Sequence, residues 1–350
     1  MAGSVLVAMS GGVDSSHCAA ILLEQGWHVE GVYMRLWGGS RRGSSCSTAD
    51  HSAAQAAADH LGVALHTVDW TADFERQVIA PFVASAAEGE IGNPCISCNR
   101  QFKIQGLVSV ADRLDIRWIA SGHYAQVVHE GHLPGLYRAA DHHKDQSYVM
   151  WALTPPVLER LLLPNGHLHK EEIRRRATTM GLPAAATPDS MDLCFDPKQA
   201  VKTALGSRPG RMVDSGGNHL GDIEDVGMVA IGQRRGLGLP PHPEGPRYVL
   251  RVEPQARRVV IGSAADLMTT QIRMTDWTPT QAPTGDLGLF LQTSAHGHPL
   301  PGRLHVEDNT AVFSLDGRTP RPTPGQFGVV YEGDRVIGAG VMRGSHELAQ

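Results

Sequence analysis

The stretch AMSGGVDSS (residues 8–16) lies between the apolar run SVLVAM and the Ala- and Leu-rich segment HCAAILLEQG. This is the order of a buried strand, a glycine-rich turn and a helix. Backbone N–H groups of such a turn form an anion site, and glycines let a phosphate come close. The alternative is a plain Gly-Gly connection. Because the turn continues Val13-Asp14-Ser15 and lacks the GK[ST] ending of kinase P-loops, it predicts a different phosphate loop.

The pattern around this stretch predicts the fold class. Up to about residue 205, apolar β-type runs such as HVEGVYM, VALHTVDW and RWIASGHYA alternate with helical segments, which Gly62 and Gly181 end. This alternation predicts an α/β fold with a doubly wound parallel sheet. Short alternating runs rich in Gly and Pro follow, and predict a small central β-rich module and then an antiparallel β-barrel. We therefore expect a catalytic domain over 1–205, a central module over 206–265 and a barrel over 266–350.

Composition limits the class of protein. The chain has 350 residues, of which 41% are hydrophobic and 19% charged. It contains no apolar run near the roughly 20 residues that a membrane span needs, nor a signal segment at its start, so we expect a cytoplasmic protein. Five cysteines are few and odd in number, which disfavours a secreted disulfide framework. The net charge of −5 neither suggests nor excludes RNA binding.

Two cysteines stand out as reactive candidates. GNPCISCNRQFKI places Cys98 before a helical run with Asn99 as cap, where the helix dipole would favour a thiolate. The alternative is half of a zinc site, but a second pair at zinc-finger spacing is absent. Cys194 lies in a Pro- and Asp-rich loop, TPDSMDLCFDP, from which it could meet another thiol. Cys18 and Cys46 are interpreted as structural.

SGGVDSS resembles the PP-loop of the N-type ATP pyrophosphatases, which cleave ATP between the α and β phosphates. Together with NPCxxCN, SGHYA, KDQSY, PDSxDLCF, IGQRRGLG and TPGQ, in that order, it makes the chain similar nearly end to end to the bacterial tRNA-specific 2-thiouridylases. That family adenylates the carbon-2 oxygen of the wobble uridine (position 34) of tRNA. Sulfur from a cysteine persulfide then replaces the oxygen, giving 2-thiouridine, AMP and pyrophosphate. The resemblance implies ATP and Mg²⁺ as cofactors.

The resemblance also implies roles for individual residues. Cys98 becomes the first catalytic cysteine and Cys194 the persulfide carrier, with a disulfide between them after sulfur transfer. The nucleotide-binding residues implied are Ala8, Met9, Ser10, Gly11, Gly12, Val13, Asp14, Ser15, Met34 and Gly122. The tRNA-contacting residues implied are Asn93, Pro94, Cys95, His123, Lys144, Asp145, Gln146, Arg234, Arg235 and Gln326. Three adjacent arginines on a predicted helix, Arg174, Arg175 and Arg176, are further candidates for phosphate contacts.

One position departs from the family pattern. Many members have Asn-Pro-Asp where this chain has Asn93-Pro94-Cys95, so a general base at that position is in doubt. The trio Cys95, Cys98 and Cys194 also resembles the three-cysteine sets that hold a [4Fe-4S] cluster in other RNA thiolases. We favour a cluster-free persulfide route, and the sequence leaves both open.

The implied partners are tRNA, with Glu, Gln and Lys acceptors expected, and a cysteine desulfurase or sulfur-relay protein as persulfide donor. We expect no membrane partner and a monomer. Two other classes compete with this interpretation. A PP-loop ligase that adenylates a small molecule would need neither Cys98 nor Cys194, and a non-catalytic metal- or RNA-binding protein would have little use for Asp14 in a complete PP-loop.

Overall fold

A computed structural model describes residues 3–36, 48–130, 133–189, 193–227, 229–243 and 245–344. The chain forms two compact units. Unit 1 comprises residues 1–78, 95–195 and 334–336, and unit 2 comprises residues 79–94, 196–333 and 337–350. Cys46 lies outside the described residues.

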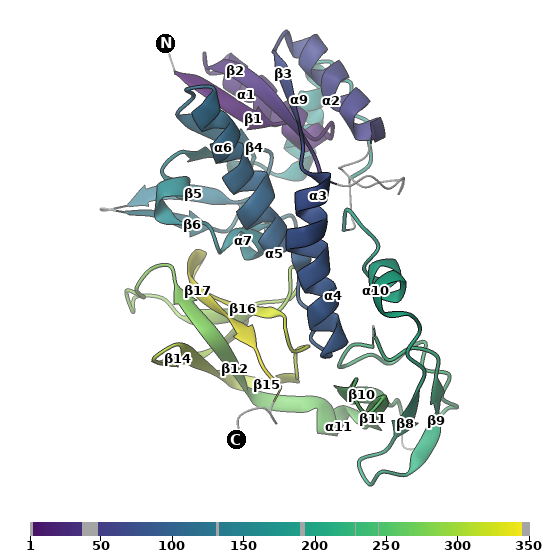
Figure 1. The fold of residues 1–350 in the computed structure, drawn as a ribbon. Coiled ribbons are helices and arrows are strands. Elements are labelled where there is room, and N and C mark those ends of the chain that lie inside the picture. Colours follow the sequence, from purple (N-terminus) through teal and green to yellow (C-terminus); the bar gives the residue numbers. More distant parts are fainter. Residues whose placement is uncertain are drawn as a thin grey trace. The chain divides into compact units, whose positions relative to one another are not determined.

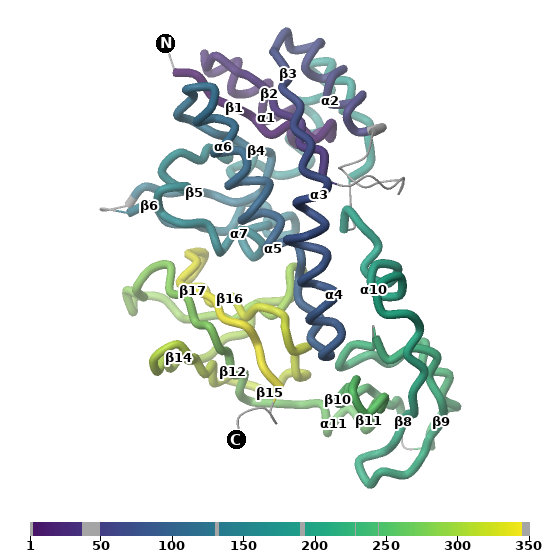
Figure 2. Tube along the Cα trace, in the orientation of Figure 1, coloured from purple at the N-terminus to yellow at the C-terminus, as the bar shows by residue number. Residues whose placement is uncertain are grey.

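A parallel sheet forms the centre of unit 1. Its strands, in spatial order, are β3 (Leu65–Asp69), β2 (His28–Arg35), β1 (Ser4–Ala8), β4 (Trp118–Ser121) and β7 (Leu161–Leu162). Val7 of β1 lies opposite Gly31 of β2 and Ala120 of β4, so segments far apart in the sequence run side by side (Figure 2). The strand order places β1, and the turn that follows it, in the middle of the sheet. The predicted parallel α/β sheet is confirmed.

Helices cover the sheet because its central strand is apolar on both faces. Val5 and Val7 belong to a buried cluster that includes Cys18 of α1 and Ala57 of α2. Because successive side chains of a strand point to opposite faces of the sheet, Leu6 lies on the other face. Helix α6 contacts β1 and β4 (Figure 1). The helices between residues 13 and 179 outside unit 2 are α1 (Val13–Glu24), α2 (Thr48–Leu61), α3 (Thr71–Phe74), α5 (Pro94–Cys98), α6 (Gln105–Arg113), α7 (Ser147–Met150), α8 (Pro155–Leu158) and α9 (Lys170–Thr179).

Shorter elements complete unit 1. Two π-helical turns span Glu75–Ile79 and Asn99–Ile104, and a 3-10 turn spans Pro164–His167. Strands β5 (Gln126–Glu130) and β6 (Leu133–Tyr137) form an antiparallel pair. Gly62 and Gly181 have φ of 68° and 67°, as expected of glycines that end α2 and α9.

Unit 2 contains the central module and the barrel. The module is a sheet with the order β10 (Tyr248–Glu253), β11 (Arg258–Gly262), β8 (Gly210–Val213) and β9 (His219–Ile223). The barrel strands are β12 (Met268–Pro279), β15 (Thr310–Pro320), β14 (Leu300–Glu307), β13 (Leu289–Gln292), β16 (Phe327–Glu332) and β17 (Arg335–Met342), closed by pairing of β12 with β17. The helices are α4 (Ala80–Ala87), α10 (Pro197–Leu205) and α11 (Ala264–Leu267). The predicted antiparallel barrel is confirmed.

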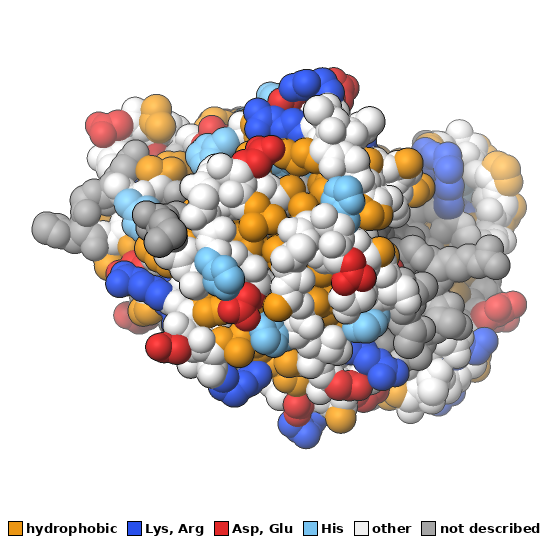
Figure 3. Space-filling model, turned by 90° about the horizontal axis from the view of Figure 1, so that it is seen from above, with side chains coloured by type: hydrophobic (Ala, Val, Ile, Leu, Met, Phe, Trp, Pro, Cys, Tyr) orange, Lys and Arg blue, Asp and Glu red, His pale blue; other side chains and the backbone are white. Residues whose placement is uncertain are grey.

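The surface carries charges of both signs. In the view from above, acidic, basic and His side chains are interspersed with small apolar areas (Figure 3). Within the described residues, no helix is both long and apolar enough to cross a membrane.

Candidate functional site

The loop after β1, residues 9–12, has a backbone at Gly11 that favours glycine. Gly11 has a φ of +81°, and a Cβ there would lie 2.7 Å from the main-chain oxygen of Asp50. The loop is held from within, because the Ser10 N–H donates to Ser15 Oγ (3.2 Å) and that hydroxyl donates to the Gly12 oxygen (3.1 Å). Gly12 is the N-cap of α1 and offers no side-chain cap. The first N–H groups of α1 therefore suit an anion.

The end of β4 packs directly against this loop. A Cβ at Gly122 would lie 2.6 Å from the carbonyl carbon and oxygen of Asp14, closer than real Cβ contacts allow. Asn165, from the 3-10 turn, donates from Nδ2 to the main-chain oxygens of Asp14 (2.9 Å) and Gly122 (3.1 Å). Sequence reasoning identified Gly122 and missed Asn165, which is fully buried.

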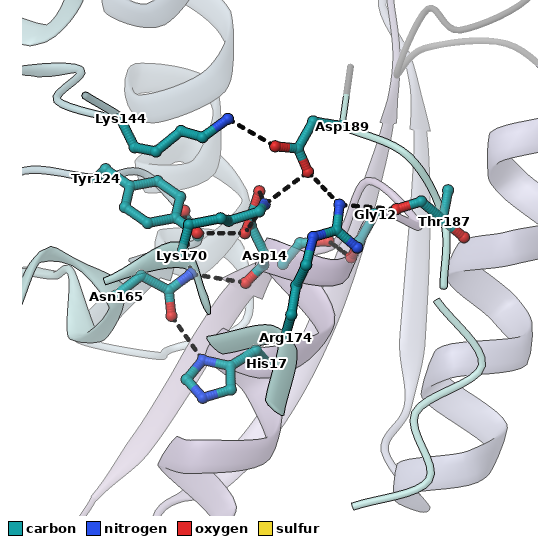
Figure 4. Close-up of polar contacts among 12 residues, drawn as sticks. Gly12, Asp14, His17, Tyr124, Lys144, Asn165, Lys170, Arg174, Thr187 and Asp189 are labelled. Carbon is teal, nitrogen blue, oxygen red and sulfur yellow. Dashed lines mark hydrogen bonds and ion pairs between the residues drawn. The ribbon is translucent and has the colours of Figure 1, made fainter. Parts of the chain in front are cut away.

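His17 of helix α1 contacts the other end of the Asn165 amide. Its Nδ1 lies 2.8 Å from Asn165 Oδ1, and burial lowers the pKa of the imidazole (Figure 4). Because the amide nitrogen of Asn165 already donates to two carbonyls, its oxygen accepts, and Nδ1 of neutral His17 carries the proton. The amide orientation of Asn165 is thereby fixed.

The carboxylate of Asp14 has two strong donors. Lys170 Nζ lies 2.7 and 2.8 Å from the two carboxylate oxygens, and the Tyr124 hydroxyl donates to Oδ1 over 2.6 Å (Figure 4). Burial, together with the adjacent Asp14 charge, raises the pKa of Tyr124 above its usual range, so the hydroxyl stays a donor. The sequence placed Asp14 in the loop and gave no role to Lys170.

Asp189 joins the same network from the segment that leads to Cys194. Its carboxylate lies 2.9 Å from Lys170 Nζ, 2.7 Å from Lys144 Nζ and 2.5 Å from an Arg174 nitrogen. Burial opposes ionisation, but hydrogen bonds from Lys144 and Lys170 lower the pKa of Asp189. Arg174, whose side chain is 33% exposed, pairs with Asp189, and Arg175 and Arg176 pair with Glu172 on their own helix. Phosphate contacts by these three arginines remain a prediction.

Asp145 and Gln146 of the KDQ motif (residues 144–146) hold the neighbouring backbone in place. Asp145 has a 3% exposed side chain that pairs with Arg138 and accepts the Ala139 and Ser147 N–H groups. Gln146 accepts the Tyr124 N–H and donates its own N–H to the Tyr124 oxygen. These contacts fix the SGHYA turn, and the tRNA role of the motif stays a prediction.

His123 and Met34 lie at the ends of β4 and β2, the two strands that flank β1. Partly buried His123 has its Nδ1 2.8 Å from Ser121 Oγ, and burial, with a smaller effect of Lys103, lowers its pKa to about 3. Its imidazole is therefore neutral at physiological pH. Met34 lies near the end of β2, opposite Val68 of β3. Both residues lie toward the carboxyl ends of parallel strands, where open α/β sheets bind ligands.

The surroundings of Cys98 differ from those expected. Helix α5 begins at Pro94 and ends at Cys98, and the helical path continues through Asn99, whose amide donates to the Val149 oxygen. The expectation that Cys98 lies just before a helix capped by Asn99 is wrong, because the helix begins four positions earlier at Pro94, a residue favoured in the first turn. Cys98 is buried with 5% exposure. Its reactivity cannot be attributed to a helix N-terminus.

The other cysteines divide by burial. Cys18 is completely buried, and burial raises the pKa of its thiol. Cys95 and Cys194 are partly exposed. Among the described residues, no group of three or more His, Cys, Asp or Glu side chains is arranged to hold a metal ion. The trio of Cys95, Cys98 and Cys194 is therefore not assembled as a ligand set.

Predicted tRNA residues of unit 2 lie in two places. Gln326 donates from Nε2 to the oxygen of Ile91 over 2.7 Å, next to Asn93 and Pro94 in the sequence. Arg234 and Arg235 are exposed and line a shallow cavity of about 470 Å³. Their contacts with RNA remain predictions.

Comparison with known proteins identifies the family. Three family models match in succession: a tRNA methyl transferase HUP domain over residues 3–198, a tRNA methyl transferase PRC-barrel domain over 198–263 and an aminomethyltransferase beta-barrel domain over 268–342. The tRNA-specific 2-thiouridylase of Mycolicibacterium gilvum is 40% identical, over 98% of this chain and 99% of its own. The chain belongs to this family. The tRNA-specific 2-thiouridylase of Sorangium cellulosum is 37% identical, over 96% of this chain and 91% of its own.

Proposed function

We propose that this protein is a tRNA-uridine 2-sulfurtransferase that uses ATP to form 2-thiouridine at the wobble position. The observation that carries the proposal is identity of 37–40% to named tRNA-specific 2-thiouridylases over nearly the whole chain. The assembled PP-loop, with Gly122 against Asp14, supports the adenylation half of the reaction.

The first half-reaction activates the uridine. The carbon-2 oxygen attacks the α phosphorus of ATP, and the bond from that phosphorus to the α–β bridging oxygen breaks, so pyrophosphate leaves with the electron pair. The loop over Ser10, Gly11 and Gly12 and the first N–H groups of α1 bind the phosphates. The result is an adenylated oxygen, which is a good leaving group.

The second half-reaction replaces that oxygen. The outer sulfur of a Cys194 persulfide attacks carbon 2, and AMP leaves with the former carbon-2 oxygen. The Cys98 thiolate then attacks the Cys194 sulfur, breaking the S–S bond and leaving the thiocarbonyl sulfur on the base. The products are 2-thiouridine and a Cys98–Cys194 disulfide, which an external thiol must reduce before the next turnover.

The Asp14 carboxylate fits a role in binding Mg²⁺, since carboxylate oxygens are preferred ligands of that ion. Magnesium would neutralise phosphate charge when bound. We propose residues 1–205 as the catalytic part and residues 206–265 and 266–350 as parts that contact tRNA. The substrates are expected to be tRNAs with Glu, Gln and Lys acceptors, and the sulfur source a desulfurase or relay protein.

The substrate can be tested through AMP formation. Unmodified tRNA should stimulate release of AMP and pyrophosphate from ATP, while the same tRNA already thiolated at carbon 2 should not. Stimulation by a small molecule without tRNA would support the ligase alternative and contradict the proposal.

A further inference from the structure

The opening loop lacks the lysine that P-loops use to reach the β and γ phosphates, so its phosphates need positive charge from elsewhere. Lys170 is positioned to supply it. It is the first residue of α9, yet its ammonium group contacts both carboxylate oxygens of Asp14, the second residue of α1 (Figure 4). This lysine is 156 positions from the loop in sequence.

The burial of Lys170 is unusual for its residue type. Its side chain is 9% exposed, and lysines are almost never buried without paired charges. Two carboxylates share the ammonium, Asp14 and Asp189, and the Tyr124 ring centroid lies 5.6 Å away. An amine held by two acids on different segments is fixed in position even if one acid finds another partner.

Cationic side chains gather beside the phosphate loop. Lys144, Lys170 and Arg174 all pair with the carboxylate of Asp189, and Lys170 also pairs with Asp14. Asp141 is a third carboxylate, whose Oδ2 accepts the backbone N–H of Lys170 at the first turn of α9. The ammonium group of Lys170 thus contacts Asp14 of the phosphate loop directly.

We infer that Lys170 is the phosphate-binding lysine of this loop and contacts the β phosphate of ATP and the departing pyrophosphate. The inference rests on the proposed function. Asp189 would hold the ammonium group in place if Asp14 bound Mg²⁺. A contact with the leaving group stabilises the negative charge that develops as the α–β bond breaks.

The test compares ligands that differ in their phosphates. We expect Lys170→Met to weaken binding of α,β-methylene-ATP and of inorganic pyrophosphate, each with Mg²⁺, about 10- to 100-fold. AMP lacks the β phosphate, so its affinity should stay within about twofold. Lys202→Met, which removes an exposed lysine of α10, is the matched control and should bind all three ligands like the wild type.

A second comparison, between Asp14→Asn and the double variant Asp14→Asn with Lys170→Met, separates phosphate binding from neutralisation of Asp14. In the double variant, position 14 is an uncharged amide, so the loss of the lysine leaves no unpaired carboxylate there. This comparison also serves if Lys170→Met alone fails to fold. If Lys170 contacts phosphate, this double variant binds pyrophosphate at least tenfold more weakly than Asp14→Asn alone. Equal affinity of the two would overturn the inference, as would unchanged analogue binding by folded Lys170→Met. Absence of nucleotide binding by the wild type would instead contradict the proposed function itself.

Discussion

Asn165 donates from Nδ2 to the main-chain oxygen of Asp14 over 2.9 Å, although 151 positions separate the two residues. The same nitrogen reaches Gly122, and the amide oxygen accepts from His17. One buried side chain thereby joins the phosphate loop, the end of β4 and helix α1. The loop geometry depends on a residue outside every motif that the sequence offered.

Replacing Asn165 should loosen this junction. Asn165→Ala removes three hydrogen bonds and leaves the buried imidazole N–H of His17 without its acceptor, so we expect a loss of about 3 kcal/mol in the free energy of unfolding. Urea denaturation measures this loss. Asn218→Ala, at an exposed turn of the central module, should cost about 0.5 kcal/mol or less. Similar losses for both variants would contradict the stabilising role of the Asn165 hydrogen bonds.

A methyl group at Gly122 should displace the loop. Because a Cβ would lie 2.6 Å from the Asp14 carbonyl, Gly122→Ala should weaken binding of ATP and AMP alike, by about tenfold or more. Calorimetric titration measures both ligands. Gly317→Ala is the control, since its Cβ would meet no heavy atom within 4 Å. Unchanged nucleotide affinity of Gly122→Ala would show that the loop tolerates the shift.

The neutral imidazole of His123 predicts a pH dependence of stability. Its folded pKa of about 3 lies below the ordinary unfolded value of about 6.5, so in that interval the unfolded chain binds the extra proton. The free energy of unfolding should therefore fall as the pH decreases from about 6.5 toward 3. His123→Gln should make this pH dependence shallower than in the wild type, as measured by denaturation at a series of pH values. Identical slopes would show that His123 titrates normally.

The cysteines should separate the two half-reactions. We expect Cys98→Ser and Cys194→Ser to abolish 2-thiouridine formation while tRNA-dependent release of pyrophosphate persists in the first turnover. Cys18→Ala should retain thiolation, because Cys18 is buried in the core with its thiol protonated. Loss of pyrophosphate release in both serine variants would place these cysteines in adenylation instead.

Local patterns predicted much of the fold. The strand, turn and helix around residues 8–16 are present, with α1 beginning at Val13, and the barrel strands follow the predicted alternation. Gly11 and Gly122 have steric reasons to be glycine that agree with their predicted place at the site. These features depend on residues close together in the sequence or on general rules of sheet topology. Both can be inferred from the pattern of apolar and turn residues.

Pairings between distant segments could not be predicted in this way. Periodicity does not reveal that Lys170 reaches Asp14 or that Arg174 turns to Asp189. One signal was available, because a lysine at the start of a helix opposes the helix dipole and suggests a tertiary partner. The start of α5 was misplaced because the helix-forming run after Cys98 concealed the start at Pro94.

The most direct test of the central claim is nucleoside mass spectrometry of unmodified tRNA incubated with the iron-free protein, ATP, Mg²⁺, a persulfide donor and a thiol reductant. The account predicts 2-thiouridine at the wobble position, in an amount that depends on ATP. Thiolation only by anaerobically purified, iron-containing protein would contradict the persulfide route while keeping the substrate. Absence of 2-thiouridine in both preparations would contradict the proposed activity.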